Sequence, residues 1–198
     1  MAETTLSTET RQIGDVEAPA PGTWVLDESH TRAAFVARHM MVTKVRGHFD
    51  RLSGKVQIGA TPEESSVEVT LDAASIFSGD QKRDDHLRSP DFLEVEKYPT
   101  ITFRSTSVKQ TGPTSLDVTG DLTIRDQTRP VELKVDFEGV ERTPWGITVA
   151  GFSATAEINR EDWGMTWNAA LETGGVVVGK KVTLEIETEL NPAQAKAA

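Results

Sequence analysis

The chain of 198 residues contains no cysteine, so disulfide bridges and thiolate metal sites are excluded. It also lacks any apolar run of the ~18 residues that a transmembrane helix requires. Basic residues are scarce, because 21 Lys and Arg face 31 Asp and Glu and leave a net charge of −10. That balance repels nucleic acid and anionic membrane surfaces. Neither nucleic-acid binding nor stable membrane insertion is therefore expected.

The first 22 residues have neither the basic region nor the apolar region of a secretory signal, so a cytoplasmic location is expected. They are polar and without periodicity, and we predict a disordered leader over 1–22. Residues 191–198 are predicted to be a flexible tail. The folded domain is thus expected to cover 23–190.

Apolar and polar side chains alternate over most of the remaining sequence. In PVELKVDF, for example, Val131, Leu133 and Val135 share one face, and Glu132 and Lys134 the other. This alternation is typical of antiparallel strands with one buried face. It predicts strands at 23–28, 32–41, 43–59, 65–75, 100–110, 115–126, 130–140, 146–158 and 179–190.

These segments favour an all-β antiparallel barrel of about eight strands over a sandwich. The segment 43–59 would span roughly 50 Å at about 3.3 Å per residue, with bends expected at Gly47 and Ser53-Gly54. Long bent strands fit a barrel well, and the Cys–Trp–Cys pattern of immunoglobulin domains is absent.

One short helix is predicted near 80–88, with Ser78 as its N-cap, Gln81 as the capping-box partner and Pro90 after its end. Its charged residues are interpreted as a solvated face with ion pairs, because adjacent helical positions point in different directions and form no catalytic relay.

The predicted inward faces mix small and large residues. Small side chains leave space for an elongated apolar ligand, but large partners such as Trp163 would fill the same space and give a solid core. The pattern alone leaves both open. The candidate wall residues are Phe35, Val118, Leu122, Ile124, Phe137, Ala150, Phe152, Ala154 and Trp163.

The chain carries few signs of catalysis or metal binding. Its four histidines form no H-x-H or H-E-x-x-H motif, and there is no G-x-S-x-G, P-loop or G-x-G-x-x-G sequence. No metal is expected. His39 shares its strand parity with Phe35 and Ala37, so we expect it to point inward as a polar group of an apolar pocket.

Several blocks resemble the YceI family of small lipid-binding proteins, in one order and with compatible gaps. They cover nearly everything from 22 to 190 and include WVLDESHTRAAFVARHM (24–40), VRGHFDRLSGKV (45–56), RDDHLRSPDFLEVEKYPTITFRST (83–106), VTGDLTIRDQTRPVEL (118–133) and GFSATAEINREDWGMTW (151–167). The resemblance implies a lipocalin-like barrel, usually dimeric, with a long apolar channel for a polyprenyl chain or isoprenoid quinone. It favours the cavity over the solid core.

The family motifs match His39, the R-D-x-H-L run from Arg83 to Leu87, and Asn159-Arg160. A desolvated lipid head needs a hydrogen-bond partner. The resemblance therefore makes His39, Arg83 and Arg160 the polar candidates for ligand binding.

The leading hypothesis is a homodimeric protein that sequesters or carries one long apolar lipid, with no cofactor beyond that bound polyprenyl or quinone-type molecule. Two alternatives stay open. One is a lipid isomerase or hydrolase with His39 or His86 as base. The other is an interaction module in which the barrel is solid and the acidic surface is the working part.

Overall fold

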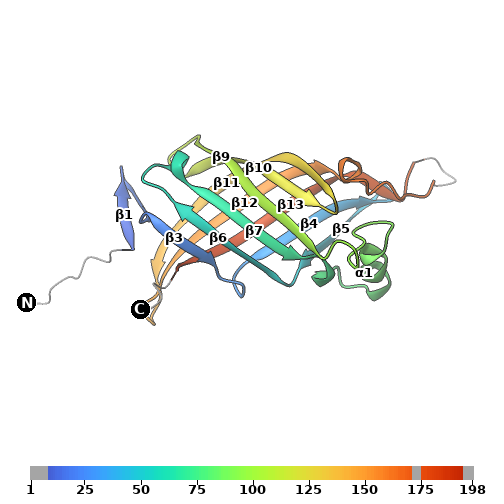
Figure 1. Cartoon of the computed structure of the whole chain (residues 1–198), viewed down its shortest axis with the longest axis horizontal. Coiled ribbons are helices and arrows are strands. Elements are labelled where there is room, and N and C mark those ends of the chain that lie inside the picture. The colour runs from blue at the N-terminus through green and yellow to red at the C-terminus, as the bar shows by residue number, and fades with distance from the viewer. Residues whose placement is uncertain (1–8, 171–174, 194–198) are drawn as a thin grey trace, which may run out of the picture.

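The structure is a computed structural model that describes residues 9–170 and 175–193. Eight antiparallel strands form a closed barrel (Figure 1). In order around the ring they are β12 (Thr148–Asn159), β11 (Gln127–Arg142), β10 (Ser115–Ile124), β9 (Thr100–Gln110), β7 (Ser66–Asp72), β6 (Leu52–Ile58), β3 (Gly22–Leu26) and β13 (Val178–Pro192). The ladder between β12 and β13 completes the ring. The predicted all-β antiparallel barrel is confirmed.

Strand β13 pairs with two strands along one edge. Its first part pairs with β4 (Arg32–His39), and its last residues pair with β3. β4 continues the sheet through β5 (Thr43–Phe49) to the short β8 (Ile76–Phe77). Residues 27–31 connect β3 to β4 and lie outside the ladder with β13. β3 and β4 therefore continue one wall of the barrel, with an interruption between them.

A second interruption divides the strand predicted at 43–59 into β5 and β6, and the expected bend positions were wrong. The break falls at Asp50 and Arg51, whose backbone N–H groups donate to the carbonyl and the hydroxyl of Ser75. Gly47 and Gly54 lie inside ladders instead. Gly47 is required by packing, because a Cβ there would lie 2.4 Å from Cζ of Phe35.

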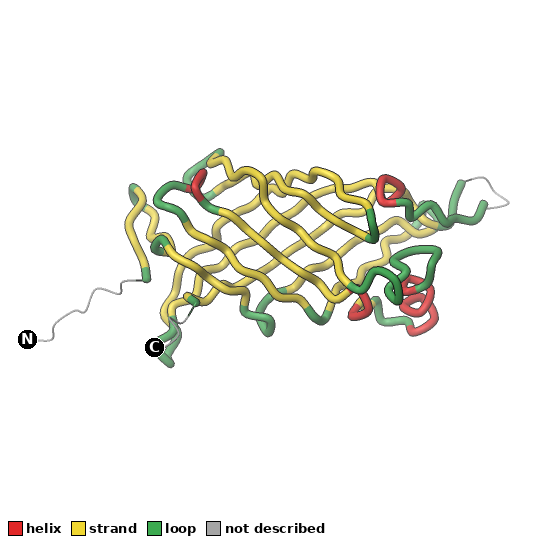
Figure 2. The backbone as a smooth tube through the Cα atoms, viewed as in Figure 1, coloured by secondary structure: helices red, strands yellow, loops and turns green. Residues whose placement is uncertain are grey.

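The helix α1 (Gln81–Arg88) lies at one end of the barrel (Figures 1 and 2). Its N-cap is Asp80, whose carboxylate accepts from the backbone N–H of Arg83 at 2.9 Å, and the predicted cap at Ser78 was wrong. Ser78 instead bonds the buried carboxylate of Asp84 through its N–H and its hydroxyl. Arg88 fastens the helix to the carbonyls of residues 74 and 76.

Short 3-10 helices complete the connections. They are η1 (Pro62–Glu64), η2 (Ala73–Ser75) and η3 (Arg160–Trp163).

The predicted disordered leader is corrected for residues 9–22. Strands β1 (Thr10–Ile13) and β2 (Val16–Pro19) form a hairpin at the end of the barrel opposite α1 (Figure 1). Ala18 and Pro19 are buried there, and the Arg11 guanidinium donates to the carbonyl of Ala60 at 2.7 Å. The hairpin is ordered because its apolar side chains cover the barrel end. Residues 1–8 lie outside the described residues.

The predicted tail is also shortened. β13 continues to Pro192, and the N–H of Ala193 donates to the carbonyl of Thr23 at 2.8 Å. Residues 194–198 lie outside the described residues.

The closing strand supplies a direct test of barrel stability. Leu190 of β13 is only 1% exposed and packs with Trp24, Ile58 and Ala150. Leu190→Ala is expected to lower the free energy of unfolding by about 2–5 kcal/mol, because it removes buried methyl groups and leaves a void. Urea unfolding measures the change.

Val25→Ala is the matched control, because Val25 lies on the neighbouring strand and is 39% exposed. Its expected loss is within about 0.5 kcal/mol. Equal losses in the two variants would contradict the placement of Leu190 in the core.

Candidate functional site

A cavity of about 350 Å³ lies inside the barrel. All eight strands of the ring contribute side chains to it, together with β4, and the alternation of each strand sends its apolar positions inward. The volume falls within the range of roughly 300–1,000 Å³ found for ligand pockets. The barrel core is therefore hollow, and the alternative of a solid barrel is not supported.

The cavity is elongated along the barrel. At one end its lining includes Pro62 and Ser65, and at the other it includes Leu87 and Phe92 of the α1 region. A second cavity of about 90 Å³ lies under the β1–β2 hairpin and shares Pro62 and Ser65 with the first. The hairpin thus covers one end of the cavity, and the α1 region covers the other.

The cavity lining is almost entirely hydrocarbon. Among the described residues that form it, the polar ones are Thr31, Ser65, Ser153, Arg160 and Thr188, and Arg160 alone carries a charge. A polar molecule placed here would lose its hydrogen bonds to water and find few replacements. The geometry therefore suits an apolar ligand.

Arg160 follows β12, at the first position of η3, and its side chain is buried, with the residue 3% exposed. Its guanidinium donates to the carbonyls of Met165, Val178 and Gly179, the last at 3.0 Å. Burial lowers its pKa from the usual value. A guanidinium has five N–H donors, and three of them are used in these bonds, so two N–H groups of Arg160 have no partner among these carbonyls.

Seven of the predicted site residues line the cavity. They are Phe35, Val118, Leu122, Ile124, Phe152, Ala154 and Arg160. Five others lie elsewhere in the structure.

Three of these five are apolar and lie outside the main cavity. Ala150 and Phe137 pack around Trp24 and Leu190 at the hairpin end, where Phe137 lines the smaller cavity. Trp163 is buried in the core, and its indole N–H donates to the carbonyl of Leu122 at 3.1 Å. Strand parity could not separate Phe137 and Ala150 from the lining residues, because it does not show where along a strand the hollow part ends.

The other two are polar. His39 ends β4 and pairs with Thr43 and Val178, past the last cavity-lining residue of its strand, Ala37. The Arg83 side chain bonds the hydroxyl and carbonyl of Ser78 at 2.7 and 2.8 Å and does not reach the cavity.

The enzyme alternative required a histidine inside the cavity. None of the four histidines is among the described residues that line it. His86 bonds the Asp91 carboxylate at 2.8 Å and packs edge-on against Phe92 and Trp167. This arrangement fixes the loop after α1 and offers the cavity no base.

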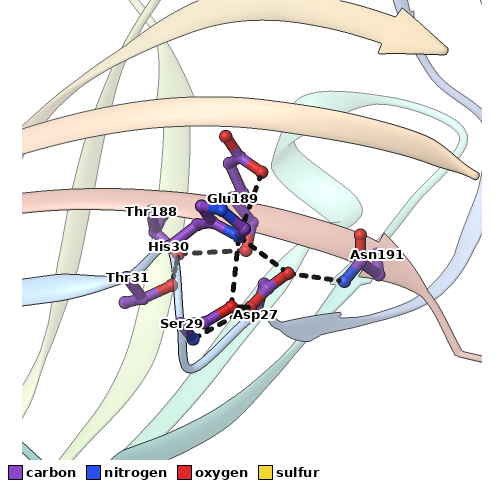
Figure 3. Close-up of polar contacts among 7 residues, drawn as sticks. All are labelled: Asp27, Ser29, His30, Thr31, Thr188, Glu189 and Asn191. Carbon is purple, nitrogen blue, oxygen red and sulfur yellow. Dashed lines mark hydrogen bonds and ion pairs between the residues drawn. The ribbon is translucent and has the colours of Figure 1, made fainter. Parts of the chain in front are cut away.

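Sequence reasoning missed a polar cluster on the outside of the wall, where residues 27–31 leave the ladder. His30 Nδ1 lies 3.1 Å from the carboxylate of Asp27 and 3.8 Å from that of Glu189 (Figure 3). Ser29 and Asn191 also donate to Asp27. The spacing Asp-x-x-His was the only local signal, because Glu189 comes from the far end of the sequence.

This cluster sits against the cavity wall. The hydroxyl groups of Thr31 and Thr188 bond each other at 2.7 Å beside it, and both residues line the cavity. Asp27, His30 and Glu189 are the one group of three metal-ligating side chains within 4.8 Å of one another in residues 9–170 and 175–193. His30 Nδ1 faces both carboxylates, so a protonated imidazole forms ion pairs with Asp27 and Glu189 and joins the loop 27–31 to β13.

The family follows from comparison with known proteins. A sequence profile of the YceI-like domain matches residues 24–190. The chain belongs to the YceI-like family. A UPF0312 protein of Staphylococcus aureus (strain N315) is 37% identical over 171 residues, which are 85% of this chain and 96% of that protein. A UPF0312 protein of Pseudomonas putida (strain KT2440) is 44% identical over 128 residues, 64% of this chain and 67% of that protein.

Solved structures show the same fold. The YceI protein of Campylobacter jejuni superposes with a TM-score of 0.69 and 25% identity, over 98% of this chain and 100% of that one. BcnA of Burkholderia cenocepacia gives 0.73 with 22% identity, over 83% and 98%. A polyisoprenoid binding domain from Saccharophagus degradans gives 0.64 with 15% identity, over 87% and 99%. The YceI-like barrel is thus shared by proteins of low sequence identity.

No helix among the described residues of this YceI-like chain has the length and hydropathy needed to cross a membrane.

The Asp27–His30–Glu189 cluster predicts a pH-dependent contribution to stability. The hydrogen bond to Asp27, and then the charge of Glu189, raise the pKa of His30 above 6.5. Hydrogen bonds from Ser29 and His30 lower the pKa of Asp27 below 3.8. The His30 contribution is complete below pH 6.5 and is lost as pH rises through its raised pKa, and the Asp27 contribution is lost as pH falls below 3.8.

His30→Gln is therefore expected to reduce the free energy of unfolding at pH 5 and to have a smaller effect at pH 9. Urea unfolding at the two pH values measures this difference. Glu189→Gln is a second variant, and it should lower the pKa of His30 in an NMR titration. An equal effect of His30→Gln at both pH values would contradict the ion-pair assignment.

Proposed function

We propose that the protein binds one long apolar lipid, of the polyisoprenoid or isoprenoid-quinone type, in the barrel interior and sequesters or carries it. The observation that supports this most is the elongated hydrocarbon-lined cavity, which extends from the hairpin end to the α1 region. A chain enclosed in such a space gains about 0.8 kcal/mol for each buried methylene group. The shape favours a long molecule over a compact one.

The solved domain from Saccharophagus degradans is described as a polyisoprenoid binding domain, and it has the same barrel fold. At 15% identity this likeness supports the fold. Together with the cavity, it makes a branched isoprenoid chain the ligand class of choice. Phe35, Val118, Leu122, Ile124, Phe152 and Ala154 are the proposed contacts of that chain.

Arg160 is the proposed partner of the polar end of the ligand. A carbonyl or hydroxyl oxygen buried with the chain needs a donor. Arg160 provides the one charged donor among the described lining residues, at the α1 end of the cavity. The homodimer and the cytoplasmic location stay predictions.

The proposal is tested by organic extraction of gently purified protein and mass spectrometry of the extract. An isoprenoid lipid in about equimolar amount is expected, or saturable uptake of added polyprenol or ubiquinone by protein that was delipidated first. Protein that contains no lipid and takes up neither compound would contradict the proposal.

Ala154→Trp makes the test specific to the cavity. Ala154 lies on β12 and lines the cavity, so an indole there occupies the ligand space. Uptake should fall by roughly tenfold or more, since two excluded methylenes already correspond to about 1.6 kcal/mol. Thr155→Trp is the matched control, because Thr155 is the next residue and is exposed. Equal uptake by the two variants would show that this wall does not contact the ligand.

A further inference from the structure

The turn between β4 and β5 carries an exposed apolar group. Met40 is 45% exposed, Met41 56% and Val42 79%. β4 and β5 lie toward the end of the barrel that carries α1 (Figure 1). These three exposed side chains form the apolar tip.

The geometry of the turn does not explain its methionines. Met40 and Met41 both have positive φ, of 49° and 59°, and the N–H of Val42 donates to the carbonyl of His39 at 3.1 Å. A hairpin turn with two positive φ values favours Asn-Gly, because a side chain beyond Cβ is disfavoured in the left-handed region. The apolar tip is thus neither buried nor suited to its backbone.

Three cations surround the apolar tip. Arg38, Lys44 and Arg46 are exposed on the outer face of β4 and β5, and Arg38 lies directly opposite Lys44 in the ladder. No carboxylate among the described residues pairs with any of the three, as the ion pairs of the structure show. Like charges on opposite strand positions repel each other, so this arrangement disfavours the isolated protein.

The apolar tip is joined to the polar end of the cavity. The N–H of Met40 donates to the carbonyl of Val177 at 2.7 Å. The next residue, Val178, lines the cavity, and its carbonyl accepts from Arg160. Ala37, three residues before Met40, also lines the cavity. A surface that contacts the apolar tip therefore lies next to the Arg160 end of the ligand space.

We propose that the apolar tip and its three cations dock this protein reversibly on a lipid bilayer that contains anionic lipid. Apolar side chains enter the boundary between head groups and acyl chains, and neighbouring cations attract anionic head groups. The inference deepens the proposed function, on which it rests, because it names the source or destination of the bound lipid. Because the net charge is −10 even with these three cations counted, the rest of the chain is acidic and opposes orientations that bring it against the anionic surface.

A bilayer fits these residues better than a second copy of the chain. A symmetric contact through the apolar tip would bring Arg38, Lys44 and Arg46 of two copies against each other, and like charges across an interface repel. The expected repulsion by anionic membranes follows from the net charge of the whole chain, whereas docking depends on the local charge of Arg38, Lys44 and Arg46 beside the apolar tip.

Co-sedimentation with vesicles tests the proposal, with phosphatidylcholine alone and phosphatidylcholine mixed with phosphatidylglycerol as the two compositions. Binding is expected to the mixed vesicles and to weaken as salt is added. Arg38→Gln/Lys44→Gln/Arg46→Gln should reduce the affinity about fivefold per charge, on the order of 100-fold in total. The control is Lys55→Gln/Lys109→Gln/Lys134→Gln, at three lysines that are exposed on other strands. It changes the net charge by the same amount and should bind the mixed vesicles more strongly than the variant at the tip.

Met40→Asn/Met41→Gly separates docking from folding. Asn and Gly are the residues that a turn with two positive φ values favours, so the thermal stability should be unchanged or higher. Vesicle binding should fall about tenfold or more, because the apolar side chains are lost. Trp145→Ser is the matched control, since Trp145 is 83% exposed in the β11–β12 turn, away from the apolar tip. It should leave vesicle binding unchanged.

Three results would overturn the docking proposal. The first is an absence of binding to mixed vesicles. The second is an equal loss of vesicle binding in the Trp145 variant and the Met40/Met41 variant. The third is an oligomer of the unchanged protein in light scattering that becomes a monomer in the Met40/Met41 variant, because the apolar tip would then contact a second copy. Lipid extraction is measured on the same preparations. A protein that contains bound lipid but does not bind vesicles would refute the docking proposal alone. A protein that binds vesicles but contains no lipid would refute the proposed lipid-binding function alone.

Discussion

Strand β13 is hydrogen-bonded along both edges, to β12 on one side and to β4 and then β3 on the other. Because this pairing closes the sheet, the inward face of every strand looks into one enclosed space. Closure also fixes which residues are neighbours on adjacent strands, such as Leu190 with Ala150 on β12 and with Leu26 on β3. The cavity, its covers at the two ends and the cluster at the interruption of β3 and β4 all depend on it.

The barrel could be predicted because its signal is local. Period-two alternation identifies a strand with one apolar face, and it located β7, β9 and β10 to within a few residues. The same parity placed Phe35, Leu122 and Ala154 on the cavity wall. The β1–β2 hairpin had a local signal as well, because Gly14-Asp15 forms a two-residue turn between its short strands. The prediction missed it because the segment is polar and shows no clear alternation.

Other features depend on distance in space and could not be read from the sequence. Parity does not show where along a strand the hollow part ends, and Ala150 and Phe137 were therefore placed on the wrong stretch of wall. His39 has inward parity but lies beyond the last ring of lining side chains. Glu189 lies within ion-pair distance of His30 only because β13 passes beside the loop 27–31 that connects β3 to β4.

The separation of charge in this molecule has a further consequence. An acidic protein with a local cluster of unpaired cations has an uneven charge distribution, so a charged surface exerts a torque on it as well as a net force. At physiological ionic strength this field extends only about 8 Å from the surface. In the docking proposed above, the molecule therefore tumbles freely until it nearly touches the surface, and the cluster of Arg38, Lys44 and Arg46 turns toward the surface only during that last approach.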